Sequence, residues 1–244
     1  MYKDLVYDCI RTSHKYAGMR SPTGAHFYAS ALFTVMCSRA VAMLRLIPTS
    51  TRVDALKNPW DFGAIAILAR ALLEARISFY YLGIEQVAED EWQCRWNIMC
   101  LHDCSARKRL FESPPEDDSP EQIAGFERQA GELRERLASN THFASLQMGQ
   151  QRRFLNGGES YMSPLEDIAL RTGINIDQFR MFYRLLSSQA HALPMAFFRM
   201  DEGNRGRGVH SELEEGYIEL ILSFCNVLLA SSRDEMHERF KNAA

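Results

Sequence analysis

Arg184 and His191 are the two residues of this chain whose types and spacing most favour chemistry. A guanidinium group stays positively charged at neutral pH, whereas an imidazole can take up and release a proton. On an α-helix seven residues make almost two turns, so both side chains would lie on one side, about 10 Å apart along the axis. Ser187 and Ser188 lie between them. These four residues, called the polar seam below, form either a functional site or a buried polar network.

The segment that carries the polar seam is predicted to be a helix that ends close to His191. Asp177 can cap a helix over residues 178–192, and Pro194 ends it three residues after His191. The other large side chains of this segment are apolar and would pack it against a core. They are Phe179, Phe182, Leu185 and Leu186.

The segment 62–82 is apolar nearly all round, which is typical of a central helix. Its exceptions are Arg70 and Glu74, four residues apart on one face, and Tyr81, which continues the same stripe. An unpaired guanidinium in a buried helix costs several kcal/mol, so we expect Arg70 and Glu74 to pair. The pair is either a structural brace or a brace that also orients Arg184 and His191.

The remaining pattern predicts an all-α protein, a helical bundle with a helical and loop insertion. No stretch shows the strict alternation of a β-strand over a useful length. The chain is expected to form one domain, 1–244. The acidic, proline-rich run E-S-P-P-E-D-D-S-P at 112–120 is expected to be a loop that opens an insertion over 112–161. Further helices are expected over residues 1–16, 25–47 with Thr23 as cap, 89–111, 165–172, and 211–241 with Ser211 and Glu214 as a capping box. Residues 121–138 are expected to be an exposed helix or hairpin arm, and 141–158 a shorter amphipathic piece.

Composition limits the classes of partner. The formal net charge of −3 gives no global attraction to nucleic acid or to an anionic membrane, so a site for a polyanion has to be local. The N-terminus lacks the uninterrupted apolar region of a signal peptide, and no apolar run reaches the roughly 18 residues that span a bilayer. We therefore expect a soluble cytoplasmic protein without a membrane partner.

The cysteines suggest neither a disulfide framework nor a metal site. The chain has six, without the close regular spacing of a small secreted scaffold, so reduced thiols are expected. Cys100 and Cys104 share one helix face, but His102 points away from them, and no C-x-x-C pair occurs. No metal and no cofactor is expected. One loop stands out in addition: D-E-G-N-R-G-R-G-V-H at 201–210 is rich in glycine and locally basic.

Four elements in this order resemble the HEPN superfamily, whose signature is an arginine and a histidine separated by four to six residues near the end of a helix. They are A-R-A-L-L-E-A (69–75), Y-Y-L (80–82), R-W…L-H (95–102) and Y-R-L-L-S…A-H (183–191). Together they look like those of a bacterial group of uncharacterised helical proteins allied to that superfamily. The resemblance covers roughly residues 25–194. HEPN ribonucleases usually have a polar residue directly after the arginine, where this chain has Leu185.

The resemblance implies a metal-independent endoribonuclease, with catalysis by attack of the ribose 2′-hydroxyl on the adjacent phosphate. His191 would act as general base or acid, Arg184 would stabilise charge on the phosphorane-like transition state, and Ser188 would hold a phosphate oxygen. Ser187, Arg70, Glu74 and Tyr81 would support the site. It also implies a homodimer with two such helices facing each other, a role as toxin or in defence against phage, and an antitoxin or another defence-system protein as partner.

A second interpretation belongs to a different class. In it the chain is a non-catalytic helical module that binds a nucleotide or a partner protein, and the network of Arg184, His191, Arg70 and Glu74 only fixes the bundle. The solvent exposure of two side chains distinguishes the two interpretations. Arg184 and His191 should line an open cleft in an enzyme and be enclosed by side-chain partners in a structural network.

Overall fold

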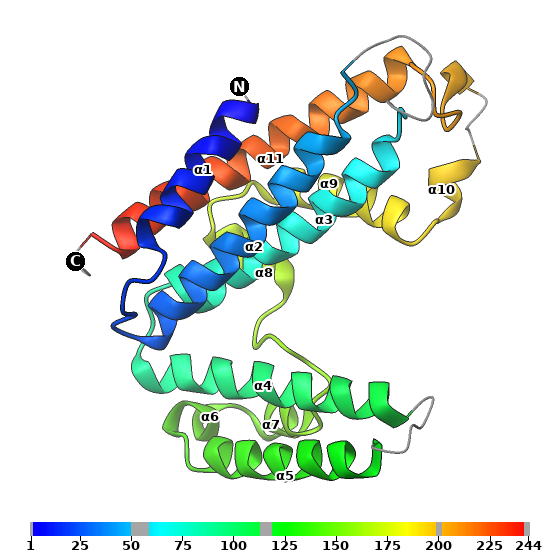
Figure 1. Cartoon of the computed structure of the whole chain (residues 1–244). Helices are drawn as coiled ribbons and strands as arrows, with labels where there is room; N and C mark the ends of the chain where they lie inside the picture. Colours follow the sequence, from blue (N-terminus) through cyan, green and yellow to red (C-terminus); the bar gives the residue numbers. More distant parts are fainter. Residues whose placement is uncertain (1, 50–58, 113–118, 199–201, 242–244) are drawn as a thin grey trace. The chain divides into compact units, whose positions relative to one another are not determined.

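The computed structural model describes residues 2–49, 59–112, 119–198 and 202–241. These residues form eleven α-helices and no β-strand, which confirms the predicted all-α fold (Figure 1). The helices are α1 (Tyr2–Tyr16), α2 (Gly24–Leu46), α3 (Phe62–Phe79), α4 (Glu89–Glu112), α5 (Ser119–Ala138), α6 (Thr141–Ser145), α7 (Met148–Leu155), α8 (Leu165–Arg171), α9 (Ile176–Ala190), α10 (Pro194–Phe197) and α11 (Glu212–Arg239). A π-helical turn, Tyr80–Ile84, follows α3 directly.

The chain separates into two compact units. Unit 1 consists of Met1–Ile84 together with Glu166–Ala244, and unit 2 of Glu85–Leu165. The predicted insertion, 112–161, falls within unit 2, which also includes α4. The polar seam belongs to unit 1, because α9 does.

Unit 1 is built around α3, as expected for the most apolar segment of the chain. This helix packs against α2, α9 and α11, and α1 packs against α2 and α11. Asp61 caps α3, since its Oδ1 accepts a hydrogen bond from the backbone N–H of Ala64 at 2.9 Å. Gly83 in the π-helical turn allows the closest approach to α2, because a Cβ atom there would lie 2.8 Å from Cα of Ala29.

In unit 2, α4 packs against α5, α6 and α7. The prediction of residues 121–138 as an exposed arm is wrong in this respect: α5 buries Ala130, Leu133 and Leu137 against α4. These residues are spaced like one face of a helix, and that face is apolar even though the rest of α5 is charged. The core of unit 2 consists of Cys94, Ile98, Leu101, Cys104, Ala130, Leu133, Leu137, Phe143 and Phe154.

The predicted helix caps and loop boundaries are found in part. Thr23 and Ser211 cap α2 and α11 as predicted. The predicted capping box at 211–214 forms only its serine half, because Oε1 of Glu214 accepts from the N–H of Gly206 instead, at 2.6 Å. Of the acidic loop predicted at 112–120, residues 113–118 lie outside the described ranges, and Glu112 and Ser119 are already helical.

Helix α2 has the length and the apolar composition of a helix that crosses a membrane. A third of its most apolar window is buried inside unit 1, and core helices of soluble proteins have the same properties. The sequence-based statement that no apolar stretch reaches such a length is therefore too strict. The expectation of a cytoplasmic protein remains an expectation.

Candidate functional site

Helix α9 presents the polar seam at its C-terminal end. The helix begins two residues earlier than predicted, and its cap is Asn175 rather than Asp177: Oδ1 of Asn175 accepts from the N–H groups of Asp177 and Gln178, at 2.9 and 3.1 Å. His191 ends the helix as its C-terminal cap, where its backbone N–H donates to the carbonyl of Ser187 at 3.1 Å. The buried face of α9 consists of Phe179, Phe182, Leu186 and Ser188.

Arg184 and His191 are both exposed to solvent. Neither side chain makes a hydrogen bond or an ion pair within the described part of the chain. One turn before Arg184, Arg180 binds Oε2 of Glu166 through Nε and Nη2, at 3.2 and 2.8 Å. That hydrogen bond, with a smaller contribution from the charge of Arg184, lowers the pKa of the Glu166 carboxyl. The two residues with assigned catalytic roles are thus accessible rather than enclosed.

The two serines of the polar seam turn toward the protein. Ser188 is 1% exposed, and its Oγ donates to the carbonyl of Leu185 in its own helix at 2.7 Å. A hydroxyl in that position does not reach a ligand, so the expected contact of Ser188 with a phosphate oxygen does not fit the structure. Ser187 is half-buried, and its Oγ accepts from Nε of Arg70 at 3.0 Å.

Arg70 ties α3 to α9. It is 9% exposed, and its Cζ lies 3.8 Å from the centre of the Tyr183 ring, a close cation–π contact. Its Nη1 lies 2.7 Å from Oε1 of Glu74, as an ion pair without the alignment of a hydrogen bond. The Glu74 side chain is 52% exposed, so water screens this pair. Arg70 contacts residues 183 and 187, on either side of Arg184, and therefore braces the seam helix.

Tyr81 lies apart from the polar seam. It is 1% exposed in the π-helical turn. Eleven residues separate it from Arg70, about 16 Å along a helix axis. The sequence placed the two on one stripe, but the structure gives Tyr81 a place in the core and not beside Arg184.

Of the polar seam, only Arg184 and His191 lie at the exposed surface. A cavity of about 320 Å³ lies next to the seam, bounded by the start of α3, the loop before α11 and Gln189 of α9. Two charged residues of this cavity, Arg205 and Glu214, are buried, at 8% and 1% exposure. A partial signal for them is visible in the sequence, because Arg205 belongs to the glycine-rich loop at 201–210.

Comparisons of this chain with known protein families, with curated proteins and with solved structures gave no match.

Proposed function

We propose that the protein is a metal-independent endoribonuclease that uses the end of α9. The observation that supports this is the combination of two accessible side chains, Arg184 and His191, with a helix held from behind by Arg70. The contacts of Arg70 with Ser187 and Tyr183 hold the backbone of α9 in place beneath the two exposed side chains. Preorganised charge at a rigid position is what phosphoryl-transfer chemistry requires.

The chemistry assigns one role to each residue. His191 accepts the proton of the ribose 2′-hydroxyl while that oxygen attacks the adjacent phosphorus. The bond from phosphorus to the 5′-oxygen breaks, and that oxygen leaves with a proton from a protonated imidazole or from water. The planar guanidinium of Arg184 faces the non-bridging oxygens, whose negative charge grows in the transition state. The products are a 2′,3′-cyclic phosphate and a 5′-hydroxyl.

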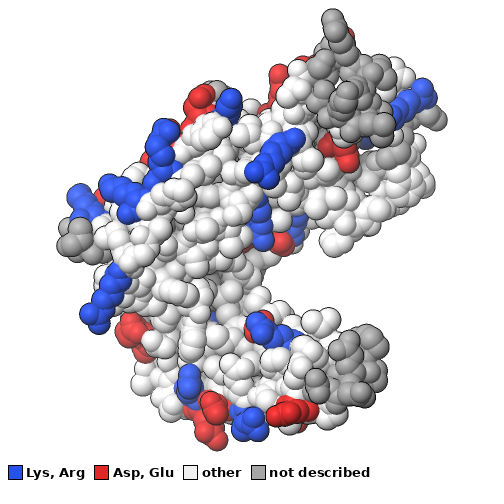
Figure 2. Space-filling model, viewed as in Figure 1, with Lys and Arg blue, Asp and Glu red and all other residues white. Residues whose placement is uncertain are grey.

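The charge distribution requires the contact with RNA to be local. On the face seen in Figure 2, Lys and Arg side chains are interspersed with Asp and Glu rather than gathered into one basic patch. Together with the net charge of −3, this gives little long-range attraction to a polyanion. We therefore expect short or single-stranded RNA segments as substrates, bound weakly and with a modest dependence on salt.

The test is cleavage of a short RNA with a chelator present. We expect cyclic-phosphate products, and no cleavage when a 2′-deoxyribose occupies the scissile position. His191→Ala should lose about 100- to 10,000-fold in rate, the usual contribution of general acid–base catalysis. Arg184→Lys keeps the charge but not the planar fork and should lose about 10- to 100-fold.

Matched controls lie on the same protein. Arg180→Lys changes another exposed arginine of α9, and His14→Ala changes an exposed histidine of α1; both should leave the rate unchanged. Full activity of His191→Ala, or loss of cleavage on chelation, would leave the polar seam without a catalytic role.

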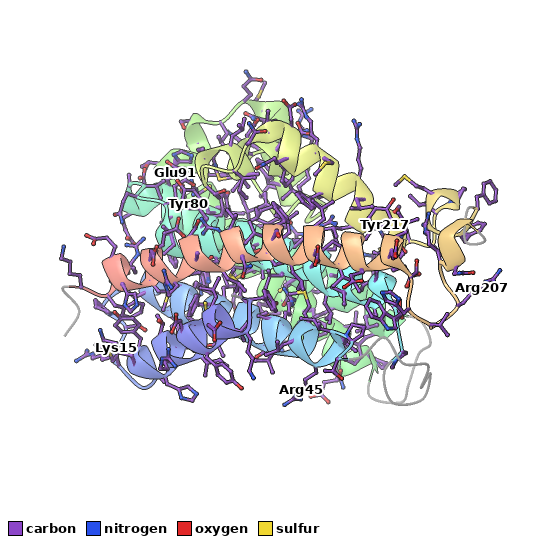
Figure 3. All side chains as sticks on the ribbon, turned by 90° about the horizontal axis from the view of Figure 1, so that it is seen from above. Lys15, Arg45, Tyr80, Glu91, Arg207 and Tyr217 are labelled. Atoms are coloured by element: carbon purple, nitrogen blue, oxygen red, sulfur yellow. The ribbon has the colours of Figure 1, made fainter. Side chains whose placement is uncertain are left out.

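The proposal includes assembly as a dimer, but through α11 and not through two facing α9 helices, which is the arrangement that the family resemblance implies. The outer side of this helix carries the residues Leu213, Gly216, Leu220, Ser223, Val227 and Ala230, spaced three and four residues apart. The three large ones are 42%, 42% and 60% exposed. Figure 3 shows α11 running across the front of unit 1. Such a stripe is the pattern of a helix that packs along a second helix.

The order of sizes along the stripe favours a second copy in antiparallel orientation. With the two-fold axis between residues 221 and 222, Leu213 meets Ala230 of the partner, Gly216 meets Val227, and Leu220 meets Ser223. Each of these pairs then combines a large side chain with a small one, which is the combination that allows close packing between two helices.

Light scattering at micromolar concentration tests the dimer. We expect a mass of two chains, and Leu220→Arg should reduce it to one chain with the helix content unchanged. Leu110→Arg is the control, because it changes a more exposed leucine, 69%, in unit 2. A monomeric wild-type protein, or a dimer that survives Leu220→Arg, would contradict this interface while leaving the cleavage assay to decide the catalytic part.

A further inference from the structure

The cavity beside α9 contains two buried charged side chains with unmet bonding capacity. It is lined by Trp60, Asp61, Phe62, Gly63, Arg205 and Glu214, among others, and has a volume of about 320 Å³. Within the described residues, Nε of Arg205 and Oε2 of Glu214 have no hydrogen-bond partner, although both atoms are buried. Leaving such atoms unpaired is costly, so their presence at one cavity calls for an explanation.

The walls of the cavity are held in place by several specific contacts. The N–H of Trp60 donates to the carbonyl of Gly208 at 3.3 Å, which fixes the glycine-rich loop to the start of α3. Ser211 donates through Oγ to the carbonyl of Gly203 at 2.6 Å. Gly206 has a φ of 68°, in the left-handed region that favours glycine, and its N–H donates to Oε1 of Glu214. The loop is therefore built around the cavity.

Aromatic rings hold Arg205 in place, and no acidic side chain forms an ion pair with it within the described residues. Its Cζ lies 5.7 Å from the ring centre of Phe62 and 5.6 Å from that of Tyr217, and these two rings stack on each other at 5.2 Å. Aromatic faces hold a guanidinium without using its N–H donors. No ion pair between Arg205 and Glu214 forms among the described residues. The planar fork of Arg205 thus keeps donors that suit a carboxylate.

Glu214 offers the complementary group. Oε1 is occupied by the Gly206 N–H, so Oε2 is the atom left to bind a ligand. Burial raises the pKa of this carboxyl, and Asp61 adds to the effect, whereas the Gly206 N–H and Arg205 oppose it. A cationic group placed at Oε2 would relieve the burial of the negative charge.

From these contacts we propose that the cavity binds a small zwitterion, a compound that carries an ammonium and a carboxylate close together, as a free amino acid does. The carboxylate binds Arg205, the ammonium binds Glu214, and the apolar part of the ligand lies against Trp60 and Phe62. The charges of Arg205 and Glu214 are then each paired with the opposite charge of the ligand. The site is distinct from the pair Arg184 and His191.

Isothermal titration of the full chain with the standard L-amino acids tests the proposal. At least one should bind, and its methyl ester and its N-acetyl derivative should both bind at least about tenfold more weakly, because each lacks one of the two charges. Guanosine monophosphate serves as a comparison, since a guanine base also combines donors for a carboxylate with acceptors for an arginine. Binding of the nucleotide but of no amino acid, or binding of neither, would overturn the proposal.

Variants of the protein give a second measurement. Glu214→Gln keeps the shape and the Gly206 contact but loses the charge, and it should weaken binding about 10- to 100-fold. Gly63→Ala narrows the cavity, because a Cβ atom there would lie 3.1 Å from Oδ1 of Asp61 and 3.2 Å from Oε1 of Gln189. Arg207→Ala, on the same loop but exposed, is the control and should bind normally, as should His191→Ala. Unchanged affinity in both Glu214→Gln and Gly63→Ala would also overturn the assignment.

Discussion

Two arginines of α3 allow a sharp test of how burial sets the strength of an ion pair. Arg76 is 1% exposed and binds Glu235 of α11 with both terminal nitrogens, at 2.5 and 2.8 Å. The Glu235 side chain is 25% exposed. Arg70 is nearly as buried, but its acidic partner Glu74 is 52% exposed. Removing the arginine therefore leaves a poorly hydrated carboxylate in one case and a well hydrated one in the other.

The expected losses follow from those environments. Breaking a buried pair costs about 3–5 kcal/mol, and the partial hydration of Glu235 places Arg76→Met near the lower end, about 3 kcal/mol. For Arg70→Met the ion pair contributes only a few tenths of a kcal/mol, the stack on Tyr183 about 1, and the hydrogen bond to Ser187 about 1. We expect about 2 kcal/mol there. The cost of several kcal/mol for an unpaired charge applies to a buried helix, whereas the Glu74 side chain is 52% exposed.

Thermal denaturation followed by far-ultraviolet circular dichroism measures both losses. At roughly 2–4 °C per kcal/mol, the melting temperature should fall by about 6–12 °C for Arg76→Met and by about 4–8 °C for Arg70→Met. Glu235→Gln and the double variant at 76 and 235 complete one thermodynamic cycle, and Glu74→Gln and the double variant at 70 and 74 complete a second. The coupling between residues 76 and 235 should exceed that between 70 and 74. Equal losses, or a coupling near zero for the pair with Glu235, would refute the assignment of Arg76 as a buried ionic link between α3 and α11.

Three further outcomes are expected. Gly83→Ala should lower the stability of unit 1 by about 1–3 kcal/mol in the same denaturation assay, because its Cβ would meet the backbone of Ala29. Glu214→Gln should raise stability at neutral pH, because it removes a buried carboxylate whose pKa is raised. A raised pKa means that the wild-type fold gains stability as pH falls from above that pKa toward the ordinary glutamate value. Denaturation over a pH series should show this gain in the wild type and not in the variant. Burial raises the pKa of Cys9 and of Cys225 to about 12, so iodoacetamide should label neither until the protein is unfolded, as read by mass spectrometry of the peptides.

The helices could be predicted because their signals are local. Apolar periodicity and the capping residues Thr23 and Ser211 lie within a few positions of the backbone groups that they satisfy. The error at the start of α9 shows the limit of such signals. Asn175 and Asp177 are both good caps, and only the packing of the first turn decides between them. The burial of α5 had a visible signal, the spacing of Ala130, Leu133 and Leu137, which its many charges obscured.

The contacts that build the candidate sites were harder to predict because they join distant parts of the chain. Arg70 and Arg76 lie on the same helix with similar neighbours, and nothing nearby shows that Arg76 meets a residue 159 positions away. The pairing of Arg70 with Glu74 was predictable from their spacing, whereas its contacts with Tyr183 and Ser187 were not. The cavity likewise requires the start of α3 and the loop before α11 to meet, through Trp60 and Gly208.

The C-terminal end of α9 is where these contacts converge. Ser187 holds Arg70, Gln189 lines the cavity, and His191 ends the helix in solvent. Successive side chains of one helical turn point in different directions, so a single turn can contact the core, a ligand cavity and the solvent at once. A rigid turn of this kind keeps His191 at a fixed position although its ring makes no hydrogen bond within the described residues. The fixed position that catalysis requires of the His191 ring can therefore come from the backbone of α9, which is held in place from its buried side. It does not have to come from hydrogen-bond partners of the imidazole itself.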